Sequence, residues 1–145
     1  QRSRRHEIPL ALLMMDIDDF KAINDAFGHL TGDMVIKETA EIVRRVVRVF
    51  DVCTRFGGEE FAVIMPASSE ESALAVAERI RARVAAYRSS ERPLEDLRVS
   101  ISIGLALCDP GMSARDLIHR ADEALYIAKR AGKNRVRSYA PGSAL

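Results

Sequence analysis

Residues 52–65, Val-Cys-Thr-Arg-Phe-Gly-Gly-Glu-Glu-Phe-Ala-Val-Ile-Met, contain two strand-like runs with a pair of glycines between them. The adjacent Gly57 and Gly58 predict a hairpin with a two-residue primed turn, because such a turn needs positive φ at its centre. Two carboxylates, Glu59 and Glu60, follow directly. Because neighbouring residues of a strand point to opposite faces, one carboxylate can enter a cleft while the other supports it, and a divalent metal ion is the expected partner.

The composition indicates one packed domain. The chain has 145 residues, 48% of them hydrophobic, which suits a single domain with a sizeable core. The formal net charge of +1 argues against a generic nucleic-acid or membrane-binding surface. Cys53 and Cys108 lie in apolar runs without metal-ligand spacing, as expected of a reduced, cytoplasmic protein. The longest apolar run, Leu10 to Met15, is too short to span a bilayer, and no signal peptide is expected.

The rest of the chain alternates between strand-like and helical patterns. Leu10–Ile17 is expected to form a buried strand because it is continuous and apolar, and Asp18 or Asp19 is expected to cap a short helix that ends near Phe27. A turn over residues 28–33 is expected to lead into a helix over about 33–49. A helix is expected over about 69–87, with Ser68 and Glu71 as its capping box, followed by a strand from Val99 to Leu107. The last helix is expected to be capped by Ser113 and Asp116 and to stop at Gly132. An edge strand with outward arginines is expected over 134–139.

This order of elements, β-αα-ββ-α-β-α-β, predicts the fold class. We expect an α+β fold in which helices flank a central, mainly antiparallel, five-stranded sheet. The expected domain is single and spans residues 1–145, with residues 1–7 as the tail of an upstream linker or helix.

Several polar residues have two interpretations when read alone. Asp16 and Asp18 could cap a helix. Asp16 also ends a strand that must lie near Glu59 and Glu60, and the carboxylate oxygens of these acids together could bind Mg²⁺. Lysines at positions 129 and 133 suit a helix C-terminus by favouring its dipole. Asn24 could be a turn residue and Asp33 a helix N-cap. Arg48 and Asp51 could form an ion pair at a helix end.

The stretch from Arg55 to Phe61, RFGGEEF, resembles the signature of the GGDEF family of diguanylate cyclases in its GGEEF form. The resemblance covers residues 8–139 and implies the palm-like, ferredoxin-related core of nucleotide cyclases. It implies a bacterial signal-transduction output domain, a transferase that condenses two GTP into cyclic di-GMP and releases two pyrophosphates. The Asp-x-Leu-Thr-Gly-Leu-x-Asn-Arg segment that usually precedes the first strand of the family is absent from this sequence.

The same resemblance implies a role for individual residues. The metal ion, Mg²⁺ with Mn²⁺ as an alternative, is bound by Asp16, the Ile17 carbonyl and Glu59, with Glu60 in support. Asp18 is left as a helix cap or a residue behind the metal ligands. Glu59 also accepts the proton of the attacking hydroxyl, and Glu60 and Lys129 complete the catalytic set. The GTP-binding residues implied are Phe20, Lys21, Asn24, Asp33, Lys129 and Lys133, and those of an inhibitory product site are Arg48, Asp51 and, as a secondary contributor, Arg79.

The expected partners follow from the reaction. Because the product is two-fold symmetric and one domain supplies one guanine pocket, two copies should face each other with one GTP each. Cyclic di-GMP at the inhibitory site and an upstream sensory or receiver module are also expected, with no nucleic acid and no membrane contact by this domain. The protein is expected in the cytoplasm, with tethering to a membrane sensor as an alternative. The rival functions are a catalytically inactive module that binds GTP or cyclic di-GMP, a related nucleotide cyclase, and a plain dimerisation domain.

Overall fold

The computed structural model describes residues 9–91 and 93–141. The expected upstream tail, residues 1–7, lies outside this part of the chain. The elements in chain order are β1 (Leu10–Ile17), α2 (Phe20–Phe27), α3 (His29–Val46), β2 (Val52–Arg55), β3 (Glu60–Pro66), α4 (Glu70–Ala86), β4 (Ile101–Leu107), α5 (Ala114–Arg130) and β5 (Val136–Ser138).

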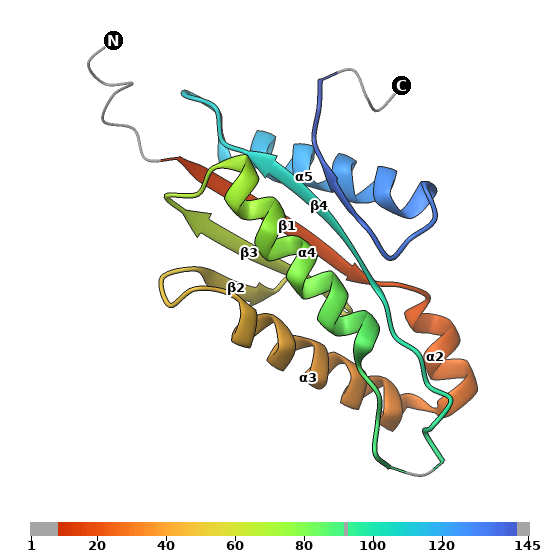
Figure 1. The fold of residues 1–145 in the computed structure, drawn as a ribbon. Helices are drawn as coiled ribbons and strands as arrows, with labels where there is room; N and C mark the ends of the chain where they lie inside the picture. The colour runs from red at the N-terminus through yellow and green to blue at the C-terminus, as the bar shows by residue number, and fades with distance from the viewer. Residues whose placement is uncertain (1–8, 92, 142–145) are drawn as a thin grey trace.

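The strands form one five-stranded sheet in the order β2-β3-β1-β4-β5 (Figure 1). The pairs β2–β3, β3–β1 and β1–β4 are antiparallel, and β5 runs parallel to β4 at the edge. The predicted α+β fold with a mainly antiparallel sheet is therefore confirmed.

The central strand β1 is apolar from Leu10 to Met15 because both of its faces are covered. Leu13 and Met15 lie in the larger core, beneath α3 and α4, whereas Leu12 and Met14 lie in the smaller core, beneath α5. Every second residue of a strand faces the same side, so a strand between two helical layers needs no polar alternation.

The described part of the chain has no helix long and apolar enough to cross a membrane.

The junction between α2 and α3 differs from the expected turn over residues 28–33. Gly28 alone separates the two helices, with φ 95° and its N–H donating to the Asn24 carbonyl at 2.8 Å. A left-handed residue ends α2, and glycine adopts this conformation without steric cost. The helix α3 therefore begins at His29, so the N-cap interpretation of Asp33 was wrong, and it ends at Val46 rather than near residue 49.

The hairpin loop is also not the predicted two-residue primed turn. Neither Gly57 nor Gly58 has its φ in the left-handed region, and the last strand pair is Arg55 with Phe61. The Arg55 guanidinium donates to the carbonyls of Gly57 at 3.2 Å and of Gly58 at 2.7 Å. The Phe56 N–H donates to the Glu60 carbonyl at 2.7 Å. A longer loop, held by a side chain of its own first strand, therefore replaces the tight turn.

Two helix caps were predicted from serines, and one prediction was wrong by one residue. Ser113 caps α5, since its Oγ accepts the Asp116 N–H at 3.1 Å, as predicted. In α4 the cap is Ser69, whose Oγ accepts the Ser72 N–H at 3.1 Å. Ser68 is instead fully buried beside the preceding strand.

Candidate functional site

The end of β1 meets the hairpin loop at one edge of the smaller core. Asp16 lies opposite Glu60 of β3 on one side and Ser102 of β4 on the other. The Ile17 N–H donates to the Glu59 carbonyl at 3.2 Å, which holds the loop against the end of β1. Antiparallel pairing thus brings Asp16 together with Glu59 and Glu60, which lie more than forty positions further along the chain.

Asp16 has the properties of a carboxylate that is ready to bind a cation. Its Oδ1 atom is buried without a hydrogen-bond partner within the described chain. Burial is the main reason why its pKa is raised to about 6; Glu59 and Glu60 act in the same direction, and Lys129 opposes them. An unpaired, desolvated oxygen beside two further acids is costly unless a cation neutralises it.

The acids therefore fit a hard divalent cation, although they do not form a complete protein cage. No group of three or more His, Cys, Asp or Glu side chains that could hold a metal ion occurs in residues 9–91 and 93–141. Mg²⁺ commonly keeps several waters and is bound by one or two carboxylates together with substrate phosphates. The arrangement around Asp16 fits that kind of site, in which the protein supplies only some of the oxygen ligands.

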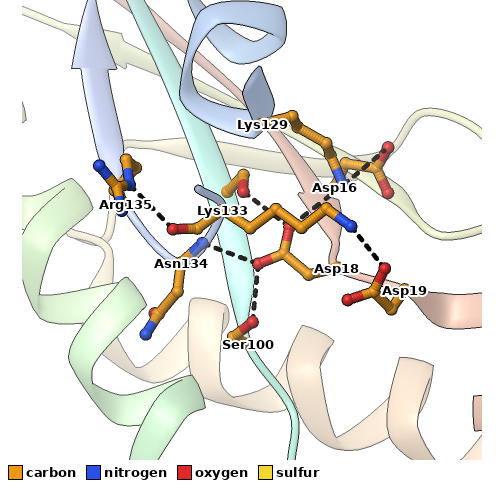
Figure 2. Close-up of polar contacts among 9 residues, drawn as sticks. Asp16, Asp18, Asp19, Ser100, Lys129, Lys133, Asn134 and Arg135 are labelled. Atoms are coloured by element: carbon orange, nitrogen blue, oxygen red, sulfur yellow. Dashed lines mark hydrogen bonds and ion pairs between the residues drawn. The ribbon is translucent and has the colours of Figure 1, made fainter. Parts of the chain in front are cut away.

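Asp18 has a different environment from Asp16, although only one residue separates them. It is 4% exposed and accepts four hydrogen bonds from elsewhere in the fold (Figure 2). The donors are Ser100 Oγ at 2.7 Å, Ser102 Oγ at 2.6 Å, the Asn134 N–H at 2.9 Å and Lys129 Nζ at 3.2 Å.

Burial acts to raise the pKa of Asp18, but these hydrogen bonds outweigh it and lower the pKa. The expected helix-capping role of Asp18 was therefore wrong, because its carboxylate points to β4 and α5. Asp19 occupies the N-cap position of α2 without forming a side-chain cap. Sequence reasoning missed Ser100 and Ser102, whose signal is a serine at every second position of an apolar strand.

The two lysines near the end of α5 pair with acids at the end of β1 and just after it. Lys129 Nζ lies 3.6 Å from Asp16 Oδ2 and 3.2 Å from Asp18 Oδ1. Lys133, with φ 65°, donates to Asp19 Oδ1 at 2.6 Å, which raises the pKa of the lysine (Figure 2). These contacts go beyond a favourable interaction with the helix dipole, because they join α5 and its following loop to the end of β1.

Part of this charged group borders a pocket of about 290 Å³ between α5 and the hairpin. Its lining combines three acids, Asp16, Glu60 and Asp122, with Lys129 and two exposed aromatic residues, Phe56 and Tyr126. A pocket of this size with convergent charges can admit part of an anionic ligand and its cation.

Lys21, predicted to bind phosphate, does not join this group. Its side chain is 92% exposed and lies 3.6 Å from Asp25, one helical turn further along α2. The first turn of α2 itself has no side-chain cap, which leaves its N–H groups available to an anion.

Asn24 lies in the contact between α2 and α3, where space is very restricted. A Cβ atom on Gly32 would lie 1.8 Å from Asn24 Oδ1 and 3.1 Å from the Phe20 ring, so only glycine admits these side chains. Asn24 Oδ1 is also buried without a hydrogen-bond partner among the described residues. An unsatisfied acceptor costs about 1–3 kcal/mol, which a ligand with N–H donors would recover.

Asp33 is exposed in the second turn of α3 and lines a pocket of about 380 Å³ between that helix and the hairpin. Within the described ranges its carboxylate forms no hydrogen bond or ion pair. Both Asn24 and Asp33 thus present acceptors that the fold itself does not use.

Arg48 and Asp51 form a closed corner ahead of β2. The guanidinium binds both oxygens of Asp51, at 2.9 and 3.1 Å, and also donates to the Pro66 carbonyl at 3.1 Å and to Ser68 Oγ. The Asp51 side chain is fully buried, whereas Arg48 is 31% exposed and stacks on the exposed Phe50 ring at 4.7 Å. The pair is therefore more than a surface ion pair at a helix end, since it joins the start of β2 to the end of β3.

Arg79, the secondary product-site residue, is exposed on α4. The structure shows no contact between Arg79 and Arg48 in the part of the chain that it describes.

Comparison with known proteins places this architecture in one family. The model of the family described as "Diguanylate cyclase, GGDEF domain" matches residues 1–135. Diguanylate cyclase DosC of Escherichia coli is 42% identical over 134 residues, which cover 92% of this chain and 29% of DosC. The chain therefore spans less than a third of the length of this curated relative.

Two solved structures have the same fold. The GGDEF domain of DgcB from Caulobacter crescentus, determined in complex with c-di-GMP, has a TM-score of 0.87 and 36% identity over 94% of this chain and 81% of that one. The active GGEEF domain of a diguanylate cyclase from Vibrio cholerae has a TM-score of 0.88 and 36% identity over 97% of this chain and 89% of that one.

Proposed function

Because this chain belongs to the GGDEF-domain family of diguanylate cyclases, we propose that it condenses two GTP molecules into cyclic di-GMP and releases two pyrophosphates. The observation that carries the proposal is the buried, unpaired oxygen of Asp16 beside the hairpin acids, with Lys129 next to it. Such a site suits a reaction in which a cation and phosphate groups must be bound together.

The metal-binding residues proposed are Asp16, the Ile17 carbonyl and Glu59, with Glu60 in support. When bound there, Mg²⁺ or Mn²⁺ would supply charge stabilisation for the attacking and leaving oxygens of phosphoryl transfer. Glu59 accepts the proton of a 3′-hydroxyl, whose oxygen then forms a bond to the α-phosphorus of the other nucleotide. The bond from that phosphorus to the leaving pyrophosphate breaks, and Lys129 and Lys133 stabilise the released negative charge.

The residues proposed to bind the nucleotide come from the ends of three helices. Lys129 and Lys133 contact the triphosphate, with the N-terminus of α2 and Lys21 at its outer side. Asn24 and Asp33, next to Phe20, bind guanine. A carboxylate accepts hydrogen bonds from N1–H and the 2-amino group of guanine, and adenine lacks these donors in that arrangement.

Product identification tests the proposed activity directly. The protein is incubated with Mg²⁺ and GTP, and the products are separated by chromatography and identified by mass. Cyclic di-GMP and pyrophosphate in a 1:2 ratio support the proposal. Binding of GTP without turnover would instead support the inactive sensor module.

The rate per domain is expected to rise with protein concentration and to reach a plateau once dimers form. One chain supplies one set of acids and one set of base-binding residues, whereas the two-fold symmetric product needs two such half-sites. Initial rates are measured over a dilution series at saturating GTP, and GTP binding per domain, which needs one copy only, is the control. A rate per domain that stays flat far below the measured dimer affinity would contradict the half-site mechanism.

Asp33→Ser is expected to weaken the preference for GTP over ATP about tenfold or more, because the acceptor pair for the guanine edge is lost. Competition between the two nucleotides for binding measures this change. Glu38→Ser, which removes an exposed carboxylate from the same helix, is the control and should leave the preference as it is. An equal preference in the wild type and the Asp33 variant would exclude Asp33 from guanine recognition.

Arg48→Ala is expected to weaken inhibition by added cyclic di-GMP about tenfold, if Arg48, Asp51 and Arg79 bind the product as proposed. It is also expected to lower the free energy of unfolding by about 2 kcal/mol, because the buried Asp51 carboxylate loses its partner. Initial rates against added dinucleotide, below the unfolding temperature, separate the two effects. Arg45→Ala is the control, since Arg45 is 72% exposed and pairs with the surface residue Glu41. Equal inhibition of both variants would leave Arg48 with a structural role alone.

A further inference from the structure

The two acids at the end of β1 have opposite hydrogen-bonding states. Among the described residues, Asp16 has a buried oxygen without a hydrogen-bond partner, whereas both oxygens of Asp18 accept two hydrogen bonds each. An ionised carboxylate offers about four lone-pair sites, so Asp18 has no acceptor capacity left for a metal ion. The sequence pattern Asp-x-Asp therefore contains one residue available to a cation and one engaged by the protein itself.

The donors to Asp18 identify what it stabilises. Ser102 in β4, and Ser100 one residue before that strand, anchor it to the inside of the sheet. The other two donors, Lys129 Nζ and the Asn134 N–H, belong to the last turn of α5 and to the loop that follows it. Asp18 thus joins the rigid sheet to the segment that carries both lysines (Figure 2).

The loop after α5 depends on such an anchor. Lys133 and Asn134 both have left-handed backbone conformations, with φ 65° and 50°. Such conformations are unfavourable for residues other than glycine and persist where neighbouring contacts hold them. The contact from Asp18 to the Asn134 N–H is one of these, and it lies one residue from the Lys133 side chain.

We propose that Asp18 is a positioning residue for triphosphate binding: it holds Lys129 and the Lys133–Asn134 loop in place and does not bind the metal ion. A free lysine side chain has many rotamers, and a fixed carboxylate restricts them before the substrate arrives. The assignment rests on the proposed function, because it takes Lys129 and Lys133 as the phosphate-binding cations.

Binding measurements test this assignment without relying on turnover. The probes are a non-hydrolysable GTP analogue with an α,β-methylene bridge and GMP, each titrated calorimetrically in the presence of Mg²⁺. Asp18→Asn keeps the side-chain size but loses the charge and presents an N–H₂ group to two of its donors. We expect it to weaken binding of the GTP analogue about tenfold and binding of GMP less than twofold.

A variant comparison separates positioning from an independent effect. If Asp18 acts through the two lysines, the triple variant Asp18→Asn/Lys129→Met/Lys133→Met should bind the analogue about as weakly as Lys129→Met/Lys133→Met. Additive losses in the triple variant, or equal losses for the analogue and GMP, would overturn the proposal. Ser102→Ala removes one contact to Asp18 and retains its charge, and we expect a loss of about threefold for the analogue. If Asp18→Asn does not fold, Ser102→Ala serves as the test in its place. An unchanged affinity of Ser102→Ala for the GTP analogue would refute the proposal.

Metal binding gives a second, independent readout. Electron paramagnetic resonance measures the affinity for Mn²⁺ in the presence of saturating GTP analogue. We expect Asp16→Asn to weaken Mn²⁺ binding by more than tenfold. We expect Asp18→Asn to weaken it by less than twofold. Equal weakening by both variants would make Asp18 a metal ligand and overturn the proposal. A wild-type domain that binds the analogue but forms no cyclic dinucleotide would refute the proposed activity, while these binding data would still decide the role of Asp18.

Discussion

Replacing Glu59 with glutamine is expected to reduce turnover by a factor of about 10² or more, with little change in the fold. Glutamine keeps the size of the side chain but removes the charge that would bind the cation and the base that would accept the hydroxyl proton. The contact that holds the loop, from the Ile17 N–H to the Glu59 carbonyl, involves the backbone and is retained. Initial rates of cyclic di-GMP formation and thermal unfolding, measured on the same preparation, check both parts of the expectation.

Glu71→Gln is the matched control for this experiment. Glu71 is an exposed acid in the first turn of α4, beyond the end of β3 and outside the acidic group. Its replacement should leave turnover unchanged within about twofold, since surface substitutions are usually within 0.5 kcal/mol. Wild-type activity in Glu59→Gln would show that Glu59 is neither a metal ligand nor the proton acceptor.

Gly104→Ala is expected to lower the free energy of unfolding by about 3 kcal/mol. Gly104 lies in β4 directly beneath α5, and a Cβ atom there would lie 2.2 Å from the Leu125 N and 2.3 Å from the Ala121 carbonyl oxygen. These are backbone atoms of α5, so no rotamer change can relieve the overlap, and the whole helix must move away from the sheet. Because α5 carries Lys129, the variant should also bind GTP less tightly.

Urea denaturation of wild type and variant measures the change in stability. Gly58→Ala is the control, because a Cβ atom on Gly58 meets no atom within 4 Å and its φ lies outside the left-handed region. This second variant should change the free energy of unfolding by less than about 0.5 kcal/mol. If Gly104→Ala and the wild type were equally stable, the expected overlap between the new Cβ atom and the backbone of α5 would be refuted.

Most elements could be predicted from local patterns, and the errors have local physical causes. The strand Leu10–Ile17 was predicted with its observed bounds, because an apolar run of that length can only be a buried strand or helix and acids end it. The start of α3 was misplaced because Gly32, read as a turn residue, serves as a packing site inside the helix against Asn24. The hairpin turn was misjudged because the Arg55 guanidinium holds the glycine carbonyls, and this side-chain contact leaves no trace in turn statistics.

The acidic and basic residues of the candidate site were named from the sequence, through the RFGGEEF motif and its resemblance to a known family. Their identity could be predicted because motif spacing along the chain is itself the signal. Sequence patterns also predicted the helix α5, the strand β5 and the sheet, because the spacing of apolar residues shows which face of an element is buried.

The resemblance to the family assigned the metal ion to Asp16 and left Asp18 as a helix cap or a support for the metal ligands, but only the tertiary structure decided which groups engage Asp18. Read alone, the two acids are equivalent members of one Asp-x-Asp pattern, and both also suited a helix cap. The donors to Asp18 lie 82 to 116 positions further along the chain, at β4, in the last turn of α5 and in the loop after it. Local propensity and spacing describe neighbours along the chain, whereas the protonation and availability of a carboxylate depend on groups that only folding brings within hydrogen-bond distance.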